Sequence, residues 1–459
     1  MIEPGAGPWA DEGRKAFEAL GARFLWLVYH DFSGLARAKI VPGSRVADAF
    51  VTGATFNKAN WDADVMGALV EGSTYGADAG DFRAVPDPAT LVRVPYREGV
   101  AQAYCYLFDR RGEWPGDPRR RLLEQAEALR HQGLRVRVGL EAELILVEEF
   151  AEPQGTAGTR MFSLSDIDAR WEYWADVLDT LNTMGVAVHQ LGVEYGAAQY
   201  EISLMPADPV VACDWMLTAR QVVKALAAER GWIASFMPKP WANRPGNGIH
   251  VHLSLSDAAG RDVLTDPDDV AYMTPLARDM LAGLLHHAPA QVALGSPTAN
   301  SFRRLRPGTW APAHVTWGVG NRAVLIRIPS GPPSPVRFEH RSGDFSANLY
   351  LHVLGLLAAT TDGVNADLSL PPITPGAVND WSDEEARAHG VARLPGTLSA
   401  ALDALTVDEA LKSALGPTIY EHYLAVKRQE ARFSDREIEA APSQSAVTDW
   451  EISTYLKAL

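Results

Sequence analysis

Two segments of the chain alternate polar and apolar residues with a period of two, and this alternation constrains the fold more than any other sequence feature. In VGLEAELILV the alternating acids are Glu141 and Glu143, and in GIHVHLSLS the alternating polar residues are His250, His252 and Ser254. On an extended strand every second side chain points to the same face. The chain is therefore expected to form a sheet with one apolar face and one face of carboxylate and imidazole groups.

Two further segments add charges to the same kind of pattern. VRFEHRSGD places Arg337, Glu339 and Arg341 at every second position, and GVEYGAAQYEISL contributes Glu194 and Glu201. Burying several carboxylates on apolar strands is costly unless cations lie between them. Oxygen ligands with one imidazole suit Mg²⁺ or Mn²⁺ better than zinc.

Each of these patterns alone also fits a structural role. The paired acids fit a strand edge in water, the two histidines fit a hydrogen-bonded core pair, and the Arg-Glu-Arg strand fits an intramolecular ion-pair ladder. The hypothesis of a metal site therefore depends on the segments occurring together in one chain.

Composition excludes several classes of partner. The chain has 459 residues, of which 47% are hydrophobic and 22% charged, which is typical of a soluble globular protein of two or three domains. A formal net charge of -15 argues against nucleic acid or an anionic membrane as a partner. Cys105 and Cys213 are the two cysteines, and the first residues lack a secretion-signal pattern, so a reducing cytoplasm is the expected location.

The order of strand and helix patterns predicts an α+β fold with two domains. The segment 23–42 has two β-like runs around Ser33-Gly34, which predicts a hairpin. Asp117 and Pro118 predict the start of a helix that ends before Gly133. Helical and strand runs then mix without a regular βαβ repeat. We expect an N-terminal domain of residues 1–114 and a second domain of residues 115–459.

Arginine-rich segments point to an anionic ligand beside the carboxylates. NSFRRLRPGTWAP holds Arg303, Arg304 and Arg306, while NRAVLIRIP predicts an apolar strand with Arg322 and Arg327 at its two ends. Arginine binds phosphate and carboxylate through two parallel hydrogen bonds. Metal ligands and arginines together suggest a polyphosphate and phosphoryl transfer, without the GxxxxGK[ST] loop of P-loop enzymes.

The segments VGLEAELILV, EYGAAQYEI, FMPKPWANRPGNGIHVHLSLS, NSFRRLRPGTWAP, NRAVLIRIP and RFEHRSGDFSAN closely resemble glutamine synthetase, in the family's order and over nearly the whole chain. The resemblance implies a small β-grasp N-terminal domain and a larger catalytic α+β domain. It also implies a homo-oligomer of two stacked hexameric rings, a dodecamer, in which a neighbouring subunit completes each active site.

The resemblance also implies a role for individual residues. The first metal site would be Glu143, Glu194 and Glu201, and the second would be Glu141, His250 and Glu339. The ATP site would comprise His252, Ser254, Arg327 and Arg337. The glutamate site would comprise Arg304, Arg341 and Gly246, with Arg322 stabilising the phosphoryl group during transfer.

The departures from the family pattern concern the ammonium site. Trp310 stands where glutamine synthetases have a glutamate, and Asn57 aligns with an aspartate of the family. The family's tyrosine beside that site aligns near Met161 or Phe162. Ammonium needs carboxylates, whereas an indole offers a π face and apolar area, so the pattern resembles γ-glutamylamide synthetases that use organic amines. Packing of the loop is the alternative role for Trp310.

The expected activity is an ATP-dependent ligase that joins glutamate to a polyamine, ethanolamine or another alkyl or aryl amine through γ-glutamyl phosphate, with Mg²⁺ or Mn²⁺. One alternative is an ordinary glutamine synthetase with a rebuilt ammonium site. The other is a structural or regulatory relative without turnover.

Overall fold

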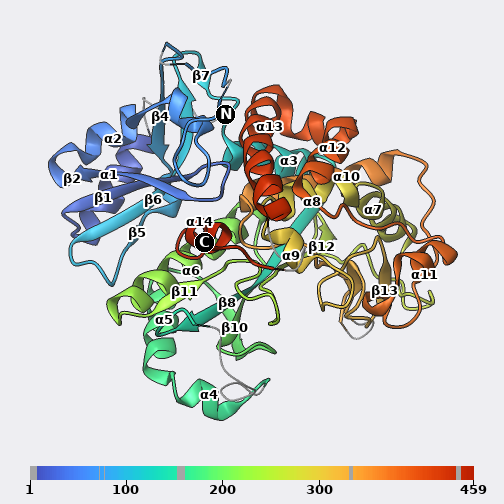
Figure 1. Ribbon diagram of the computed structural model, residues 1–459. Helices are drawn as coiled ribbons and strands as arrows, with labels where there is room; N and C mark the ends of the chain where they lie inside the picture. The colour runs from blue at the N-terminus through green and yellow to red at the C-terminus, as the bar shows by residue number, and fades with distance from the viewer. Residues whose placement is uncertain (1–7, 72, 77, 152–160, 330–333, 441–445) are drawn as a thin grey trace.

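The computed structural model describes residues 8–71, 73–76, 78–151, 161–329, 334–440 and 446–459. The fold is α+β, as predicted, with a seven-stranded sheet in the N-terminal part and an eight-stranded sheet in the larger remainder. Figure 1 shows the N-terminal part in blue and cyan beside the larger part, whose centre contains the strands β8 (Leu134–Val147) and β12 (Ile249–Asp257).

The N-terminal sheet has the strand order β2-β1-β6-β4-β3, with the short strands β5 and β7 both paired to β6. Its elements are α1 (Pro8–Leu20), β1 (Phe24–His30), β2 (Ala36–Pro42), η1 (Gly43–Arg45), α2 (Val46–Thr52), β3 (Ala54–Asn57), η2 (Lys58–Asp62), β4 (Asp81–Pro86), η3 (Pro88–Thr90), β5 (Val92–Arg93), β6 (Val100–Asp109) and β7 (Gly112–Glu113). The predicted hairpin is confirmed, because β1 and β2 pair antiparallel. The helices α1 and α2 were not anticipated by the strand patterns.

The helix α3 (Pro118–His131) begins and ends as its sequence predicts. The carboxylate of Asp117 accepts hydrogen bonds from the backbone N–H groups of Arg119 and Arg120, and Pro118 occupies the first turn, where no N–H partner is needed. Gly133 follows the helix with a φ of 83°, a left-handed conformation that glycine adopts without strain.

The larger sheet has the order β13-β14-β15-β12-β8-β10-β9, with β11 paired to β8. The remaining elements are α4 (Leu164–Asp168), α5 (Trp171–Thr183), β9 (Val188–Val193), β10 (Gln199–Leu204), α6 (Pro209–Glu229), β11 (Ile233–Ser235), α7 (Pro275–His286), α8 (Ala288–Gly295), α9 (Ser301–Arg304), β13 (Trp317–Val319), β14 (Ile326–Ile328), β15 (Phe338–His340), α10 (Leu349–Asn365), η4 (Val378–Asp380), α11 (Asp383–Ala388), α12 (Leu398–Val407), α13 (Glu409–Ala440) and α14 (Asp449–Tyr455).

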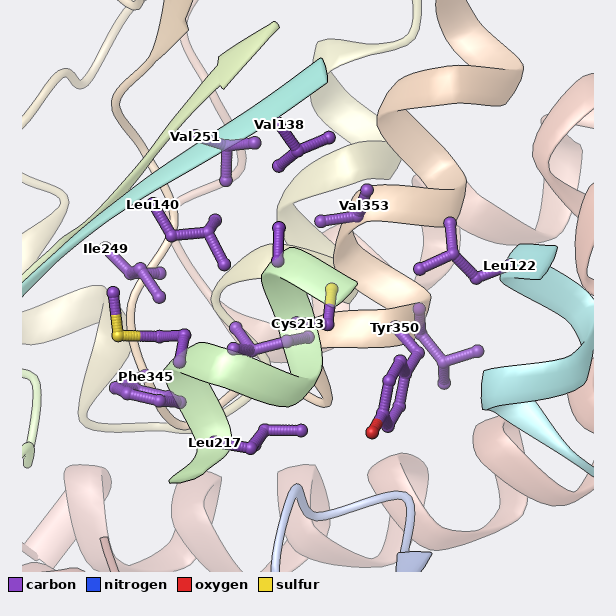
Figure 2. Close-up of a cluster of buried hydrophobic side chains, with 14 of the residues drawn as sticks. Leu122, Val138, Leu140, Cys213, Leu217, Ile249, Val251, Phe345, Tyr350 and Val353 are labelled. Atoms are coloured by element: carbon purple, nitrogen blue, oxygen red, sulfur yellow. The ribbon is translucent and has the colours of Figure 1, made fainter. Parts of the chain in front are cut away.

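One face of this sheet packs into the hydrophobic core. Leu140 and Val251, on the neighbouring strands β8 and β12, point toward Cys213 of α6 and Val353 of α10 in a cluster of buried apolar side chains (Figure 2). Successive side chains of a strand alternate between faces. The alternate residues of β8 and β12 therefore lie on the opposite face, which is where the charged groups gather.

The hairpin turn of the N-terminal part contacts the larger part at the start of α10. A Cβ atom at Gly34 would approach the carbonyl oxygen of Ala347 to 2.6 Å, so only glycine allows this contact. The side chain of Asn348 donates a hydrogen bond to the carbonyl oxygen of Asp31 at 2.8 Å. Among the described residues, no helix combines the length and apolar character needed to cross a membrane.

Candidate active site

Cross-strand pairing gathers the alternating charged residues of four strands on one sheet face. His250 of β12 lies opposite Glu141 of β8, and Glu143 of β8 lies opposite Glu201 of β10. Glu339 of β15 lies opposite His252. Directly opposed residues of antiparallel strands point to the same side. The registers therefore bring together side chains from segments almost 200 residues apart.

Glu141, His250 and Glu339 form the tightest cluster of this face. One potential ligand atom from each residue lies within 4.8 Å of the other two. The His250 Nδ1 atom is 3.5 Å from a Glu141 carboxylate oxygen and 3.9 Å from a Glu339 oxygen. Two carboxylates and one imidazole around a common point suit a divalent cation of the Mg²⁺ or Mn²⁺ type. The donor set of the second expected metal site therefore fits such an ion.

Glu143, Glu194 and Glu201 form an acidic group beside this cluster. Burial, together with repulsion from Glu141, Glu143 and Glu194, raises the pKa of Glu201 to about 9. Burial and the neighbouring Glu143 raise the pKa of Glu194 to about 7, although Arg322 opposes the shift. So much negative charge in a partly buried site favours binding of a cation. The Glu143 carboxylate also accepts a hydrogen bond from the Gly248 N–H at 2.6 Å.

The sequence VRFEHRSGD suggested ion pairs of Glu339 with both Arg337 and Arg341, but the structure pairs Glu339 with only one of them. The strand β15 covers only Phe338–His340, so the flanking arginines lie outside it. Arg327 and Arg341 both donate to the carboxylate of Glu339, with the Arg327 contact at 2.7 Å. Arg337 instead donates to His252 Nδ1 at 3.3 Å.

Glu339 is buried but remains ionised in this surrounding. The residue as a whole is 1% exposed. Burial alone would raise its pKa, but His250, Arg341, His252 and Arg327 together lower that pKa to about 2. A carboxylate held in this way carries its negative charge over the whole physiological pH range.

Arg304 lies beneath the sheet face next to a glycine-containing loop. Its buried guanidinium donates to the carbonyl oxygens of Ser342 at 2.8 Å and Arg341 at 3.0 Å. A Cβ atom at Gly248 would come within 2.4 Å of the same guanidinium, and one at Gly246 within 2.5 Å of the Pro238 carbonyl oxygen. Glycine at both positions lets the loop backbone pass close to the carboxylates.

Gln199 holds this loop in place, a role that the sequence interpretation did not identify. Its side-chain nitrogen donates to the Gly246 carbonyl oxygen and to the Asn247 side chain, both at 2.9 Å. Its side-chain oxygen accepts from the Gly196 N–H at 2.8 Å. Gln199 lies two residues before Glu201 and so on the same face of β10, but it carries no charge, so charge alternation alone does not single it out.

Arg322 and Trp310 line a cavity of about 810 Å³ next to the acidic group. The predicted strand between Arg322 and Arg327 is wrong at its first half, because β14 begins at Ile326 and Arg322 lies in the preceding turn. Trp310 is 61% exposed, and its ring centroid is 6.0 Å from that of Tyr195, which directly follows Glu194. Trp310 is therefore not packed as a buried loop anchor.

Asn57 lies away from these groups within one chain. It ends β3 of the N-terminal sheet, and its side-chain oxygen accepts from the Ala59 N–H at 2.8 Å. In the part of the chain that the structure describes, no hydrogen bond or ion pair joins Asn57 to the carboxylate-bearing strands. Ser254 lies along β12 from His252, at the alternate position that faces the same side.

Comparison with known proteins assigns this fold and site to a family. The family described as "Glutamine synthetase, catalytic domain" matches residues 115–455, and "Glutamine synthetase N-terminal domain" matches residues 16–118. The chain therefore belongs to the glutamine synthetase family, which confirms the resemblance seen in its motifs. It is accordingly an ATP-dependent ligase of the glutamine synthetase type, in a family that uses ATP and divalent metal ions.

Individual relatives carry two different names. A glutamine synthetase of Halobacterium salinarum is 32% identical over 96% of this chain and 95% of its own length. A glutamate–methylamine ligase of Methyloversatilis universalis is 33% identical over 95% of this chain and 96% of its own. The solved structure of a GmaS/ADP complex superposes with a TM-score of 0.80 at 28% identity, covering 98% of this chain and 100% of that one.

Proposed function

We propose that this protein joins glutamate to an organic amine, with ATP as the phosphoryl donor and γ-glutamyl phosphate as the intermediate. Membership of the glutamine synthetase family supports the ligase chemistry. The 33% identity to a glutamate–methylamine ligase supports an organic amine as the acceptor.

The observation that carries the choice of amine is the aromatic pair of Trp310 and Tyr195. Two segments far apart in sequence bring two rings to a centroid distance of 6.0 Å, and both rings stay more than half exposed, at 61% and 57%. The pair adjoins Glu194. Aromatic faces attract alkyl groups and organic cations but provide no anionic cage for ammonium.

The metal ions are proposed to bind two clusters of three residues each on the charged face of the sheet. Glu143, Glu194 and Glu201 would hold the first ion, and Glu141, His250 and Glu339 the second. Mg²⁺ or Mn²⁺ bound there would neutralise phosphate charge and fix the phosphate position.

The remaining residues of the chain are proposed to bind and orient the substrates. His252, Ser254, Arg327 and Arg337 would hold ATP, and Arg304, Arg341 and the Gly246 backbone would hold glutamate. Arg322 would stabilise the charge of the phosphoryl group during its transfer, and Glu194 would face the incoming amine.

The proposed reaction has two bond exchanges. An oxygen of the glutamate side-chain carboxylate bonds to the γ-phosphorus of ATP, while the bond from that phosphorus to the bridging oxygen breaks and ADP leaves. The nitrogen of the neutral amine then bonds to the acyl carbon, while the carbon–oxygen bond to phosphate breaks. Phosphate leaves, and the nitrogen gives up one proton to a carboxylate of the site.

A homo-oligomer is part of the proposal, because Asn57 lies apart from the site within its own chain. Asn57 of a neighbouring subunit would complete the amine site, in stacked hexameric rings. We also propose that residues 1–114 and 115–459 form separate domains.

Phosphate release measures the proposal directly. Purified protein is incubated with ATP, glutamate, Mg²⁺ or Mn²⁺ and one acceptor at a time: ammonium, methylamine, ethanolamine, n-butylamine or benzylamine. Phosphate release is measured, and the products are identified by mass spectrometry. We expect γ-glutamylamides from organic amines at concentrations where ammonium gives little glutamine. Phosphate release with ammonium alone would show an ordinary glutamine synthetase instead.

Two variants separate the aromatic pair from the rest of the site. Trp310→Ala should lower kcat/KM for the organic amine about ten-fold, mainly by raising KM. The reason is that it removes one aromatic contact with the amine, which contributes about 1.4 kcal/mol of binding free energy. Trp310→Glu should shift the preference toward ammonium. Trp171→Ala, at a tryptophan of α5 that is 55% exposed, is the matched control and should change neither constant. If both Trp310 variants keep the wild-type kcat/KM values for the organic amines and for ammonium, Trp310 has only a structural role.

A further inference from the structure

The cavity behind Trp310 is larger than the acceptor nitrogen requires. Its volume of about 810 Å³ lies in the range of sites for whole small molecules, roughly 300–1,000 Å³. Three loops line it, around residues 308–310, 318–323 and 373–380. A single ammonium ion or methyl group would leave most of this space unfilled.

Hydrogen bonds between the three loops hold the cavity open before any ligand binds. The Gly308 N–H donates to the Asn379 carbonyl oxygen at 2.8 Å, and the Asn321 side chain donates to the Gly376 carbonyl oxygen at 2.8 Å. The Thr374 N–H donates to the Trp317 carbonyl oxygen at 3.0 Å. A site that is formed in advance binds its ligand without an ordering cost.

Two residues that line the cavity lie close to the candidate active site, and a third lining residue carries a carboxylate. Trp310 and Arg322 line it, Trp310 contacts Tyr195, and Arg322 interacts electrostatically with Glu194. Asp380 also lines it and is exposed. Among the described residues that line the cavity, Arg322 and Asp380 are the two charged side chains.

Arg322 and Asp380 differ in whether a residue of opposite charge lies nearby. Arg322 has Glu194 nearby, whereas no described residue makes a hydrogen bond or an ion pair with the Asp380 carboxylate. An acidic tail in the cavity would be repelled by this carboxylate, and an apolar tail would gain no attraction from it. A cationic group is the complementary ligand.

We propose that the cavity receives the distal end of the acceptor amine and that Asp380 binds a second ammonium group there. The acceptors are then α,ω-diamines and longer polyamines rather than monoamines. This inference rests on the proposed use of an organic amine and adds the class of that amine.

The test compares acceptors of equal length. Phosphate release is measured with butane-1,4-diamine, n-butylamine and 4-aminobutyrate, and the ratio of kcat/KM for the diamine to that for n-butylamine is followed. We expect a ratio above one in the unaltered protein and a fall of about five-fold in Asp380→Asn, the size of one partly exposed ion pair. Asp380→Lys should lower the ratio further and improve the use of 4-aminobutyrate.

Asp367→Asn is the matched control, because Asp367 is an exposed aspartate between α10 and η4 that does not line the cavity. It should leave the ratio unchanged. A wild-type ratio of one, or a ratio that survives both Asp380 variants, would overturn the diamine assignment while organic amines still serve as acceptors. Phosphate release with ammonium alone would overturn the proposed function itself, and the two failures are thus distinct.

Discussion

Binding of divalent metal should release protons from the acidic group, and the number released can be worked out from the structure. In the metal-free protein Glu201 has a pKa of about 9 and Glu194 a pKa of about 7, for the reasons of burial and mutual repulsion given above. At pH 7 Glu201 is therefore almost fully protonated and Glu194 about half protonated. Because a metal binds the ionised carboxylates, saturation at pH 7 should release about 1.5 protons per subunit.

The pH dependence of this release has a definite sign. At pH 9 about half a proton remains on Glu201 and almost none on Glu194, so the release should fall to about 0.5 per subunit. Both pKa values lie above the ordinary glutamate value, so the folded metal-free protein binds more protons than the unfolded chain. Its stability should therefore decline as the pH rises from about 4.5 toward 9, and metal should reverse that decline.

Calorimetric titration of Mn²⁺ in buffers of different ionisation enthalpy measures the proton release at each pH. Glu201→Gln should remove about one proton of the release at pH 7. Glu149→Gln, at an exposed glutamate beyond the end of β8, is the control and should leave it unchanged. A release that stays below half a proton at pH 7, or that does not change with pH, would refute the reasoning.

Three further perturbations test other parts of the structure. Glu339→Gln should lower turnover more than about a hundred-fold, because it removes a proposed metal ligand and the partner of two arginines, and full turnover in a phosphate-release assay would contradict the assignment. Glu451→Ala should lower the free energy of unfolding in urea by about 3–5 kcal/mol, because it removes a buried carboxylate that contacts the buried guanidinium of Arg303 at 3.0 Å; a loss below about 1 kcal/mol would contradict this. His287 is buried, and although burial alone would lower its pKa, its hydrogen bonds to two aspartates, one of them Asp408 at 2.7 Å, raise that pKa above the usual 6.5. The resulting stabilisation is complete below about pH 6.5 and is lost as the pH rises through the raised pKa, so His287→Gln should flatten the thermal stability curve over that interval.

The strands of the site were predictable because the residues that form them obey local rules. Glu141 and Glu143 alternate with Leu140, Ala142 and Leu144, and a period of two leaves one face for the core and one for the charges. The helix α3 was predictable for a similar reason, since its capping residues lie within one turn of its end. Patterns of this kind depend only on neighbouring residues.

The pairing partners could not be read from the same patterns. Arg337 and Arg341 are both two residues from Glu339, and the sequence favoured both as its partners. The short strand β15 pairs with β14 so that Arg327 lies opposite Glu339, and Arg327 displaces Arg337 from that role. A choice between an arginine two residues away and one twelve residues away depends on the sheet register, which local alternation does not fix.

Aromatic residues on irregular loops were the hardest to predict. Tyr195 follows Glu194 after the end of β9, and nothing in its surroundings in sequence connects it with Trp310 more than 100 residues later. The family pattern singles out Trp310 because glutamine synthetases have a glutamate at its position, and no local pattern does so. The contact between the two rings depends on how two loops are held over the sheet, and loops have no periodic pattern that predicts this.

The partner of Arg327 gives the proposed sites a physical connection. Without ligands Arg327 donates to Glu339, and both lie on strands that carry proposed metal and nucleotide groups. On the proposed assignment, a cation bound by Glu141, His250 and Glu339 replaces Arg327 as the positive charge beside the Glu339 carboxylate. Arg327 can then bind a phosphate. The effect is reciprocal. A phosphate that binds Arg327 removes one positive charge from Glu339 and so strengthens the binding of a cation there. Metal and nucleotide should therefore bind with positive coupling through this one ion pair, in addition to any contact between the ligands themselves.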